Sequence, residues 1–169
     1  FKNLTKLSSL SYLKNDSTDD PSCDLNDIIS NIKDLILLTG SYYNFFGKLL
    51  YANKFKDFES IIKSLKKHFD DRLYFEIQRH NENEEKNFEN YLLNYSKILG
   101  IPLIATQEVF YLKEDMYEAH DALTCIGEKK FVDDKSRFKY SNQNFFKKSE
   151  QVKKLYSDIP EALENNYNF

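Results

Sequence analysis

The sequence predicts an α/β fold in which helices alternate with parallel strands. Of its 169 residues, 41% are hydrophobic and only 4 are Gly and 3 are Pro, which argues against disorder and against a turn-rich all-β fold. Between residues 35 and 106, short apolar runs alternate with helical stripes. The resulting order of strand, helix, strand, helix, strand is typical of parallel βαβ units.

The charge balance excludes a strongly basic protein. Lys and Arg together number 24 and Asp and Glu 27, a net charge of −3, with both signs interspersed. Such a chain lacks the concentrated basic field that drives non-specific binding to phosphates. The two cysteines match no zinc spacing and are too few for a disulfide framework, and no apolar run reaches the length of a membrane span. No signal peptide opens the chain, so we expect a cytoplasmic location.

The N-terminal part is expected to be helical before the first strand. Apolar residues recur at three- and four-residue steps over 1–11, a polar loop is expected over 15–21, and a short helix begins near Asp24. The chain starts at Phe1 inside a helical pattern, so we expect it to be a segment cut from a longer protein.

Three strands and two helices are predicted in the middle of the chain. The strands are expected near 35–39, 73–78 and 102–106. A stripe over 55–69 predicts an amphipathic helix, and a clearer stripe over 88–99 predicts another that ends at Gly100.

The C-terminal part is expected to hold three more helices. One covers about 116–126, and a polar stretch over 129–144 follows it. Ser149 is a favourable N-cap for the next helix. Asp158 and Glu161 have the spacing of a capping box, with Pro160 in the first turn of a final helix.

Any local site is expected where the three strands end, because functional groups gather at the carboxyl ends of parallel strands. The chain has no phosphate-binding glycine loop, no HExxH and no GxSxG. A metal site or an acid–base pair would therefore combine Ser41, Glu76, His80 and Glu108.

Each candidate also has a structural interpretation, which we favour. His80 is more readily a loop residue than a ligand. Glu76 lies in a strand that should be buried and needs a partner, so we expect an ion pair with Arg79 rather than an active-site acid. His120 lies on an apolar helical stripe and is expected to be a hydrogen-bonded packing residue.

Several stretches from residue 73 onward carry a specific resemblance: LYFEIQRH (73–80), LGIPLIAT (99–106), YEAHD (117–121), CI (125–126), FFKKS (145–149) and DIPEALEN (158–165). In order and spacing they are similar to the bacterial replicative (C-family) polymerases, the DNA polymerase III alpha subunits. Looser matches are FKNL (1–4), KL (6–7) and LTG (38–40). The resemblance places the chain in the C-terminal part of the polymerase-and-histidinol-phosphatase (PHP) domain.

The resemblance implies part of an irregular (β/α)7 barrel over residues 1–112. Residues 113–169 would then be the end of the PHP domain and a helical connection toward the polymerase palm. Active PHP domains hold metal ions at the carboxyl ends of their strands, and the first ligands of that set would precede Phe1.

Three later ligand positions of the family fall within the chain. A cysteine is replaced by Ser41, an aspartate by Glu108 and a histidine by Phe110. Phenylalanine has no lone pair to donate and a serine hydroxyl is a poor ligand beside a thiolate, so only Glu108 keeps ligand character. The resemblance thus implies a degenerate metal site and no metal or other cofactor in this segment.

The leading functional hypothesis is a structural PHP scaffold within a DNA-directed DNA polymerase, a nucleotidyltransferase of DNA replication. The family implies magnesium in a palm beyond Phe169, and DNA, the sliding clamp and the proofreading exonuclease as partners of the whole protein. The segment itself would dock the polymerase core and help to dock the exonuclease, with no membrane contact. The alternatives are an active metal-dependent phosphoesterase for proofreading or pyrophosphate hydrolysis, with metal at Glu108 and His80, and a helical interaction module unrelated to replication.

A barrel without its first strands has open edges, which invite pairing with another chain. We therefore expect the chain either to self-associate or to displace its N-terminal region.

Overall fold

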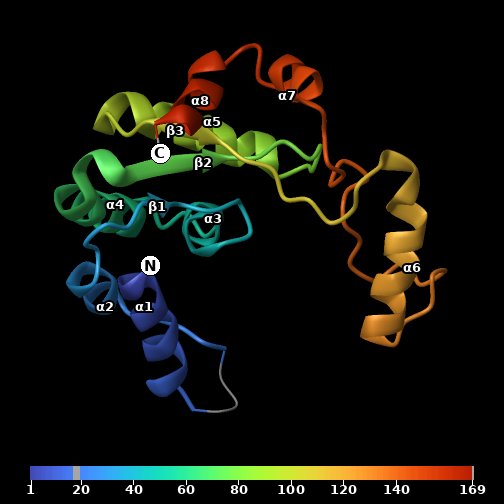
Figure 1. Ribbon diagram of the computed structural model, residues 1–169, viewed down its shortest axis with the longest axis horizontal. Coiled ribbons are helices and arrows are strands. Elements are labelled where there is room, and N and C mark those ends of the chain that lie inside the picture. Colours follow the sequence, from blue (N-terminus) through green and yellow to red (C-terminus); the bar gives the residue numbers. More distant parts are fainter. Residues whose placement is uncertain (17–19, 169) are drawn as a thin grey trace.

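The computed structural model describes residues 1–16 and 20–168 and combines helices with a small parallel sheet (Figure 1). The elements in chain order are α1 (Lys2–Leu13), α2 (Leu25–Ser30), β1 (Leu37–Leu38), α3 (Phe45–Tyr51), α4 (Phe55–Phe69), η1 (Asp70–Arg72), β2 (Leu73–Ile77), α5 (Glu85–Leu99), β3 (Leu103–Ala105), η2 (Glu114–Met116), α6 (Tyr117–Glu128), α7 (Ser149–Leu155), α8 (Pro160–Glu164) and η3 (Asn165–Tyr167).

The three strands form one sheet in the order β1-β2-β3, and both pairs are parallel. Leu37 pairs with Leu73, and Phe75 pairs with Leu103. The predicted parallel arrangement is therefore confirmed. The strands β1 and β3 are shorter than the predicted strands over 35–39 and 102–106. The described strands do not close into a barrel.

The core lies where α4 and α5 pack against one face of β2. Phe58 of α4 is fully buried, and its ring stacks on Phe75 of β2 at 6.4 Å and meets Tyr95 of α5 at 4.7 Å. Aromatic pairs of this kind add to the free energy gained by burying their area. Glu76 lies on the opposite face of β2 from Phe75, and its carboxylate bonds to residues at the strand ends, where the candidate site lies.

The helix α3 was not foreseen, because its seven residues are too few for a periodic stripe to stand out. Phe46 and Leu50 of α3 are buried beside α4. Its close packing depends on Gly47, where a Cβ atom would lie 1.7 Å from the backbone oxygen of Tyr42. Only glycine lets the helix pass that carbonyl at this distance.

The last helices cover the outer edge of β3. The side-chain amide of Asn165 donates to the carbonyl of Leu103 at 2.7 Å, and that of Asn166 donates to the carbonyl of Ala105 at 3.0 Å. These carbonyls face away from β2, so the two asparagines satisfy groups that an edge strand leaves open.

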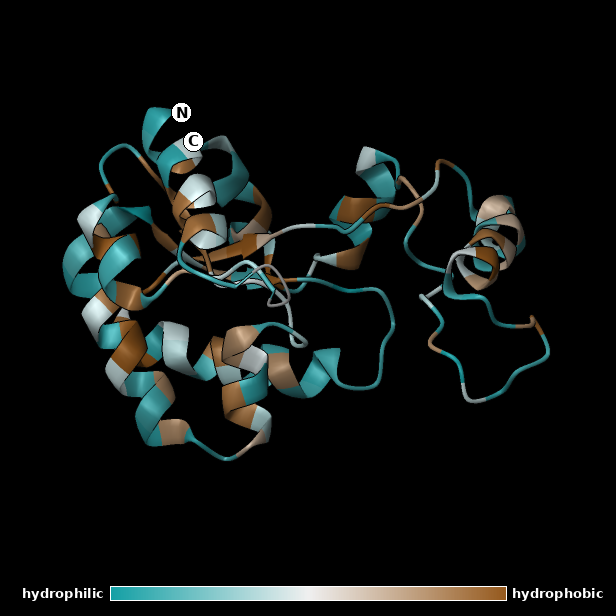
Figure 2. Cartoon of the chain, turned by 90° about the horizontal axis from the view of Figure 1, so that it is seen from below, coloured by the Kyte–Doolittle hydropathy of each residue, from teal (hydrophilic) through white to brown (hydrophobic). Residues whose placement is uncertain are grey.

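Residues 112–140 form an arm that stands apart from the sheet. Figures 1 and 2 show α6 well away from the strands, joined to them by extended chain on both sides. The arm has its own internal support, because Arg137, which is 6% exposed, makes two hydrogen bonds to the carboxylate of Asp121 on α6.

Several details of the helix ends differ from the expectations. Lys148, not Ser149, is the N-cap of α7. Ile159 is the N-cap of α8 and has no polar side-chain atom that could cap the helix, and the carboxylate of Asp158, expected in a capping box, bonds to Arg79. The helices expected from residue 1 and from near Asp24 are confirmed as α1 and α2, and Gly100 adopts the left-handed C-cap conformation. The expected loop over 15–21 includes residues 17–19, which lie outside the described residues.

None of the described helices is long and apolar enough to cross a membrane.

Candidate functional site

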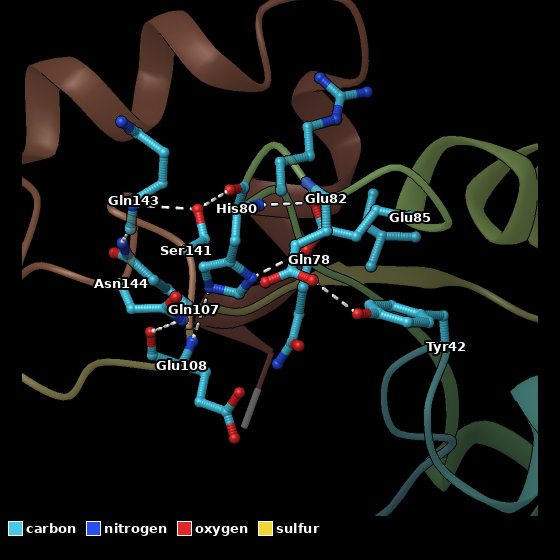
Figure 3. Close-up of polar contacts among 12 residues, drawn as sticks. Tyr42, Gln78, His80, Glu82, Glu85, Gln107, Glu108, Ser141, Gln143 and Asn144 are labelled. Atoms are coloured by element: carbon cyan, nitrogen blue, oxygen red, sulfur yellow. Dashed lines mark hydrogen bonds and ion pairs between the residues drawn. The ribbon is translucent and has the colours of Figure 1, made fainter. Parts of the chain in front are cut away.

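The strand ends form one rim, and Figure 3 shows two of the candidate residues, His80 and Glu108, bonded to each other there. Ser41 lies three residues beyond β1, His80 three beyond β2, and Glu108 three beyond β3. This equal spacing places all three at the same edge of a parallel sheet.

His80 is the most buried candidate, at 3% exposure, and it pairs with Glu85 in the first turn of α5. The ring Nδ1 lies 2.9 Å from Oε1 of Glu85, and the backbone N–H of His80 donates to Oε2 of the same carboxylate at 2.7 Å. Both oxygens of the buried Glu85 carboxylate are thereby engaged, as a buried acid requires.

The other ring nitrogen of His80 fixes the loop after β3. Nε2 accepts a hydrogen bond from the backbone N–H of Glu108 at 3.1 Å. Since Nε2 accepts, the proton of a neutral ring lies on Nδ1 and is donated to Glu85. Neither nitrogen is left to bind a metal, so His80 is a buried cross-strand connector.

Glu76 does not form the predicted ion pair with Arg79. Its carboxylate instead accepts from the backbone N–H of Gly40 at 3.1 Å, from the hydroxyl of Thr106, and from the side-chain amide of Gln78 at 3.3 Å. The prediction was wrong because residues an odd number of positions apart in an extended chain point to opposite sides, and the donors to Glu76 come from residues just beyond the ends of β1, β2 and β3.

Arg79 turns toward the C-terminal helices. Its guanidinium bonds both oxygens of Glu89 on α5 and both oxygens of Asp158 before α8, and it lies 4.9 Å above the ring of Tyr156. These bonds hold the pKa of the Asp158 carboxyl below its usual value. Arg79 is therefore a structural link between α5 and the end of the chain.

Tyr43, which the sequence analysis did not single out, lies between Ser41 and Glu108. The phenol of Tyr43 donates to Oε2 of Glu108 at 2.7 Å. Burial raises the pKa of Tyr43 to about 12, with a smaller rise from Glu108 and a partial offset from Ser41. The Ser41 hydroxyl is buried and makes no hydrogen bond of normal geometry to a described residue.

Phe110 leaves the rim and packs into the base of the arm. Its ring stacks on His120 of α6 at 5.5 Å and meets Tyr140 at 4.2 Å. The expected hydrogen bond of His120 is not formed at Nδ1, which is buried without a partner among the described residues. The predicted packing role of His120 is confirmed by its ring contacts, while its Nδ1 lacks the expected hydrogen bond.

The residues present do not fit a metal ion. Within residues 1–16 and 20–168, no three His, Cys, Asp or Glu side chains converge as a ligand set would. Glu108 is held by a phenol, His80 has both nitrogens engaged, and Phe110 offers no donor atom.

Two residues of the site, Glu85 and Tyr43, were not predicted from the sequence. An acid in the first turn of a helix is common, so Glu85 gave no signal that it would be buried against His80. Tyr43 is one of 12 tyrosines and lies in an irregular segment. Only the three-dimensional convergence of the strand ends identifies them.

Comparison with known proteins gives one family model over the N-terminal part of the chain and relatives that match almost all of it. A family model described as the PHP domain matches residues 1–80. The DNA polymerase III subunit alpha of Rickettsia bellii is 35% identical over 168 residues, which is 99% of this chain and 14% of the relative. The resemblance to the DNA polymerase III alpha subunits is confirmed.

Further alpha subunits match over the same span. That of Caulobacter vibrioides is 33% identical over 165 residues and that of Borreliella burgdorferi 34% identical over 166, in each case 98% of this chain and 14% of the relative. The chain thus spans about 14% of the length of the alpha subunits that it matches.

Proposed function

We propose that this chain is a segment of a DNA polymerase III alpha subunit and acts there as a PHP scaffold without a working metal site. The alpha-subunit relatives that match almost the entire chain support the first part. The site geometry supports the second, and one observation carries it: Phe110, at a position where the family places a ligand, is committed to the stack with His120 and Tyr140.

The scaffold role follows from what the rim residues do. His80 joins the ends of β2 and β3, Glu76 joins all three strand ends, and Arg79 holds the C-terminal helices. Side chains that are fully engaged with one another stabilise a structure but are not free to bind or activate a water molecule.

The function of the whole protein is proposed from the relatives. We infer template-directed DNA synthesis, with nucleotidyl transfer at a magnesium-binding palm beyond Phe169, in the bacterial cytoplasm. DNA, the sliding clamp and the proofreading exonuclease would be its partners, and this segment would support the polymerase core and help to dock the exonuclease. Its three strands would be part of an irregular (β/α)7 barrel.

Metal analysis of the purified chain tests the scaffold against the phosphoesterase alternative. After dialysis against zinc or manganese, we expect far less than one equivalent of metal and no hydrolysis of bis(p-nitrophenyl) phosphate. Stoichiometric metal that is lost in Glu108→Gln, together with hydrolysis, would establish the phosphoesterase instead. A His80→Gln variant is the companion measurement, because metal at His80 requires the ring nitrogen that now accepts from Glu108.

Reading the gene on both sides of this segment tests the polymerase assignment separately. Histidine motifs upstream and an acidic palm motif downstream are expected. Their absence would remove the polymerase function and leave the scaffold geometry unaffected.

A further inference from the structure

The helices α7 and α8 border a groove that runs to the end of β3. Its narrow inner part has a volume of about 120 Å³ and its outer part about 470 Å³, and the two share four lining residues, Lys147, Val152, Leu163 and Asn166. The shared lining makes them one continuous groove.

The inner part of the groove is mostly apolar. Ala105 from β3 and Leu155 and Tyr156 from α7 and its end line it beside Val152 and Leu163. The polar groups at its inner end include Arg79, which is already neutralised by Glu89 and Asp158. An occupant of the inner part must therefore present an apolar side chain.

The outer part of the groove is bordered by lysines that lack acidic partners. Lys147 and Lys153 both line it, and neither forms an ion pair with any carboxylate of residues 1–16 and 20–168. Glu164 is the one acid in the lining. The local charge therefore favours a negatively charged occupant.

The surroundings of the Lys147 ammonium also favour a negatively charged occupant. Its ammonium lies 4.4 Å from the centre of the Phe145 ring and donates to the carbonyl of Gln143, and burial lowers its pKa. A partly buried ammonium held by a ring and a carbonyl gains from a carboxylate placed next to it. Tyr167, 87% exposed at the mouth of the groove, offers an aromatic surface typical of interfaces.

We propose that this groove is a docking site for an extended peptide segment of another protein that alternates acidic and apolar side chains. The apolar side chains would enter between Val152 and Leu163, and the carboxylates would meet Lys147 and Lys153. A nucleic acid is disfavoured as the occupant because Tyr156 in the inner part is buried, which leaves Tyr167 as the one exposed ring among the described lining residues, whereas a single strand needs successive rings for its bases to stack on. The proposal does not depend on the polymerase assignment.

Titration of the chain with blocked, fluorescent dodecapeptides tests the proposal by anisotropy at low salt. The probes are a peptide alternating Glu with Leu, one alternating Lys with Leu, one alternating Glu with Ser, and a dT12 oligonucleotide. We expect saturable binding of the Glu-Leu peptide only. Equal binding of the Lys-Leu peptide, preference for dT12, or no binding of the Glu-Leu peptide at millimolar concentration would overturn the proposal.

Exposed substitutions locate the binding without disturbing the fold. Lys153→Glu should weaken binding of the Glu-Leu peptide about fivefold, since one favourable pair becomes a repulsive one. Lys67→Glu on α4 is the matched control and should leave the affinity unchanged. Tyr167→Ser should weaken binding, and Tyr12→Ser on α1 should not. Equal losses in the controls would assign the binding to non-specific charge or aromatic contact and overturn the site.

Discussion

At the residue scale, His80 connects the ends of β2 and β3 through hydrogen bonds. A metal ion shared by several strand ends can provide the same kind of connection. One side of its ring holds Glu85 at the start of α5, and the other holds the backbone after β3. Because the ring and the carboxylate are both buried, Nδ1 of His80 and Oε1 of Glu85 depend on each other for a hydrogen bond, while Oε2 of Glu85 has the backbone N–H groups of His80 and Glu82 as further donors.

Replacement of His80 by Ala should lower the free energy of unfolding by about 2–4 kcal/mol, because it leaves Oε1 of the buried Glu85 carboxylate and the N–H of Glu108 without their hydrogen-bond partner. Urea denaturation followed by circular dichroism measures the loss. His68→Ala is the control, because His68 is only partly buried and bonds one carbonyl within its own helix. Similar losses in both variants would show that His80 is not a special tie.

The pair of Asp121 and Arg137 predicts a pH dependence. The bonds from Arg137 hold the pKa of the Asp121 carboxyl below its ordinary value. Between the folded pKa and the unfolded value of about 3.9, the unfolded chain binds more protons, so stability rises with pH there. The contribution is complete above about pH 4 to 5 and is lost as the pH falls through the folded pKa.

Asp121→Asn should therefore lower stability at pH 7 and flatten its dependence on pH between 5 and 2. Thermal unfolding across this range checks both effects, with Asp133→Asn, at an exposed position on the same arm, as the control. An unchanged pH profile in Asp121→Asn would contradict the assignment.

The side-chain partners show where sequence interpretation stops. The positions of Ser41, His80 and Glu108 at one rim followed from the order of strands and helices. The partners of Arg79 did not, since Glu89 and Asp158 are 10 and 79 residues away and nothing local distinguishes them from other acids. Glu76 and Arg79, close in sequence, were paired wrongly because their side chains point to opposite sides of the chain.

At the element scale, the long periodic helices were predictable from their stripes, whereas the short helix α3 was not predicted. The stripes over α4 and α5 repeat often enough to be unambiguous, and glycine marks the end of α5. In α3, by contrast, only two turns exist, and its packing depends on the closeness of Gly47 to Tyr42, which no sequence pattern records.

Two glycines in helices should respond to alanine in opposite directions. Gly47→Ala should destabilise the chain by more than about 2 kcal/mol, because the new methyl group meets the backbone carbonyl of Tyr42. Gly127→Ala in α6 should stabilise it by up to about 1 kcal/mol, since nothing lies within 4 Å of the added methyl group and alanine favours a helix. Chemical denaturation of both variants measures the difference, and a tolerated Gly47→Ala would show that α3 can move away.

The edge of β3 was also invisible in the sequence. Asn165 and Asn166 bond the outward carbonyls of β3, which leaves β1 as the edge more open to a further strand. The expectation that a barrel without its first strands has open edges did not anticipate that η3 would cover the edge of β3.

At the scale of the whole molecule, apolar side chains are unevenly distributed. The arm exposes Leu123 (65%), Ile126 (75%) and Phe131 (85%), close to one another along the chain. Figure 2 shows hydrophobic segments on α6 and on the chain around it, away from the sheet. Exposed apolar surface of this kind tends to be covered by another surface.

Self-association through the arm is therefore expected at high concentration. The double variant Ile126→Lys, Phe131→Ser should reduce it, as measured by sedimentation velocity over a hundredfold concentration range. Leu13→Lys, on the equally exposed end of α1, is the control and should leave association unchanged. A wild-type chain that stays monomeric throughout would contradict the expectation.

The hydrogen bonds of Arg79 have a mechanical consequence. Arg79 lies two residues beyond β2, immediately before His80, and it bonds Asp158 just before α8. A force applied beyond α8 would first load the bonds from Asn165 and Asn166 to β3, and then the pair of Arg79 and Asp158 beside the middle strand. A force on the arm would not pass through Arg79. The last helices are therefore coupled mechanically to two strands of the sheet in turn.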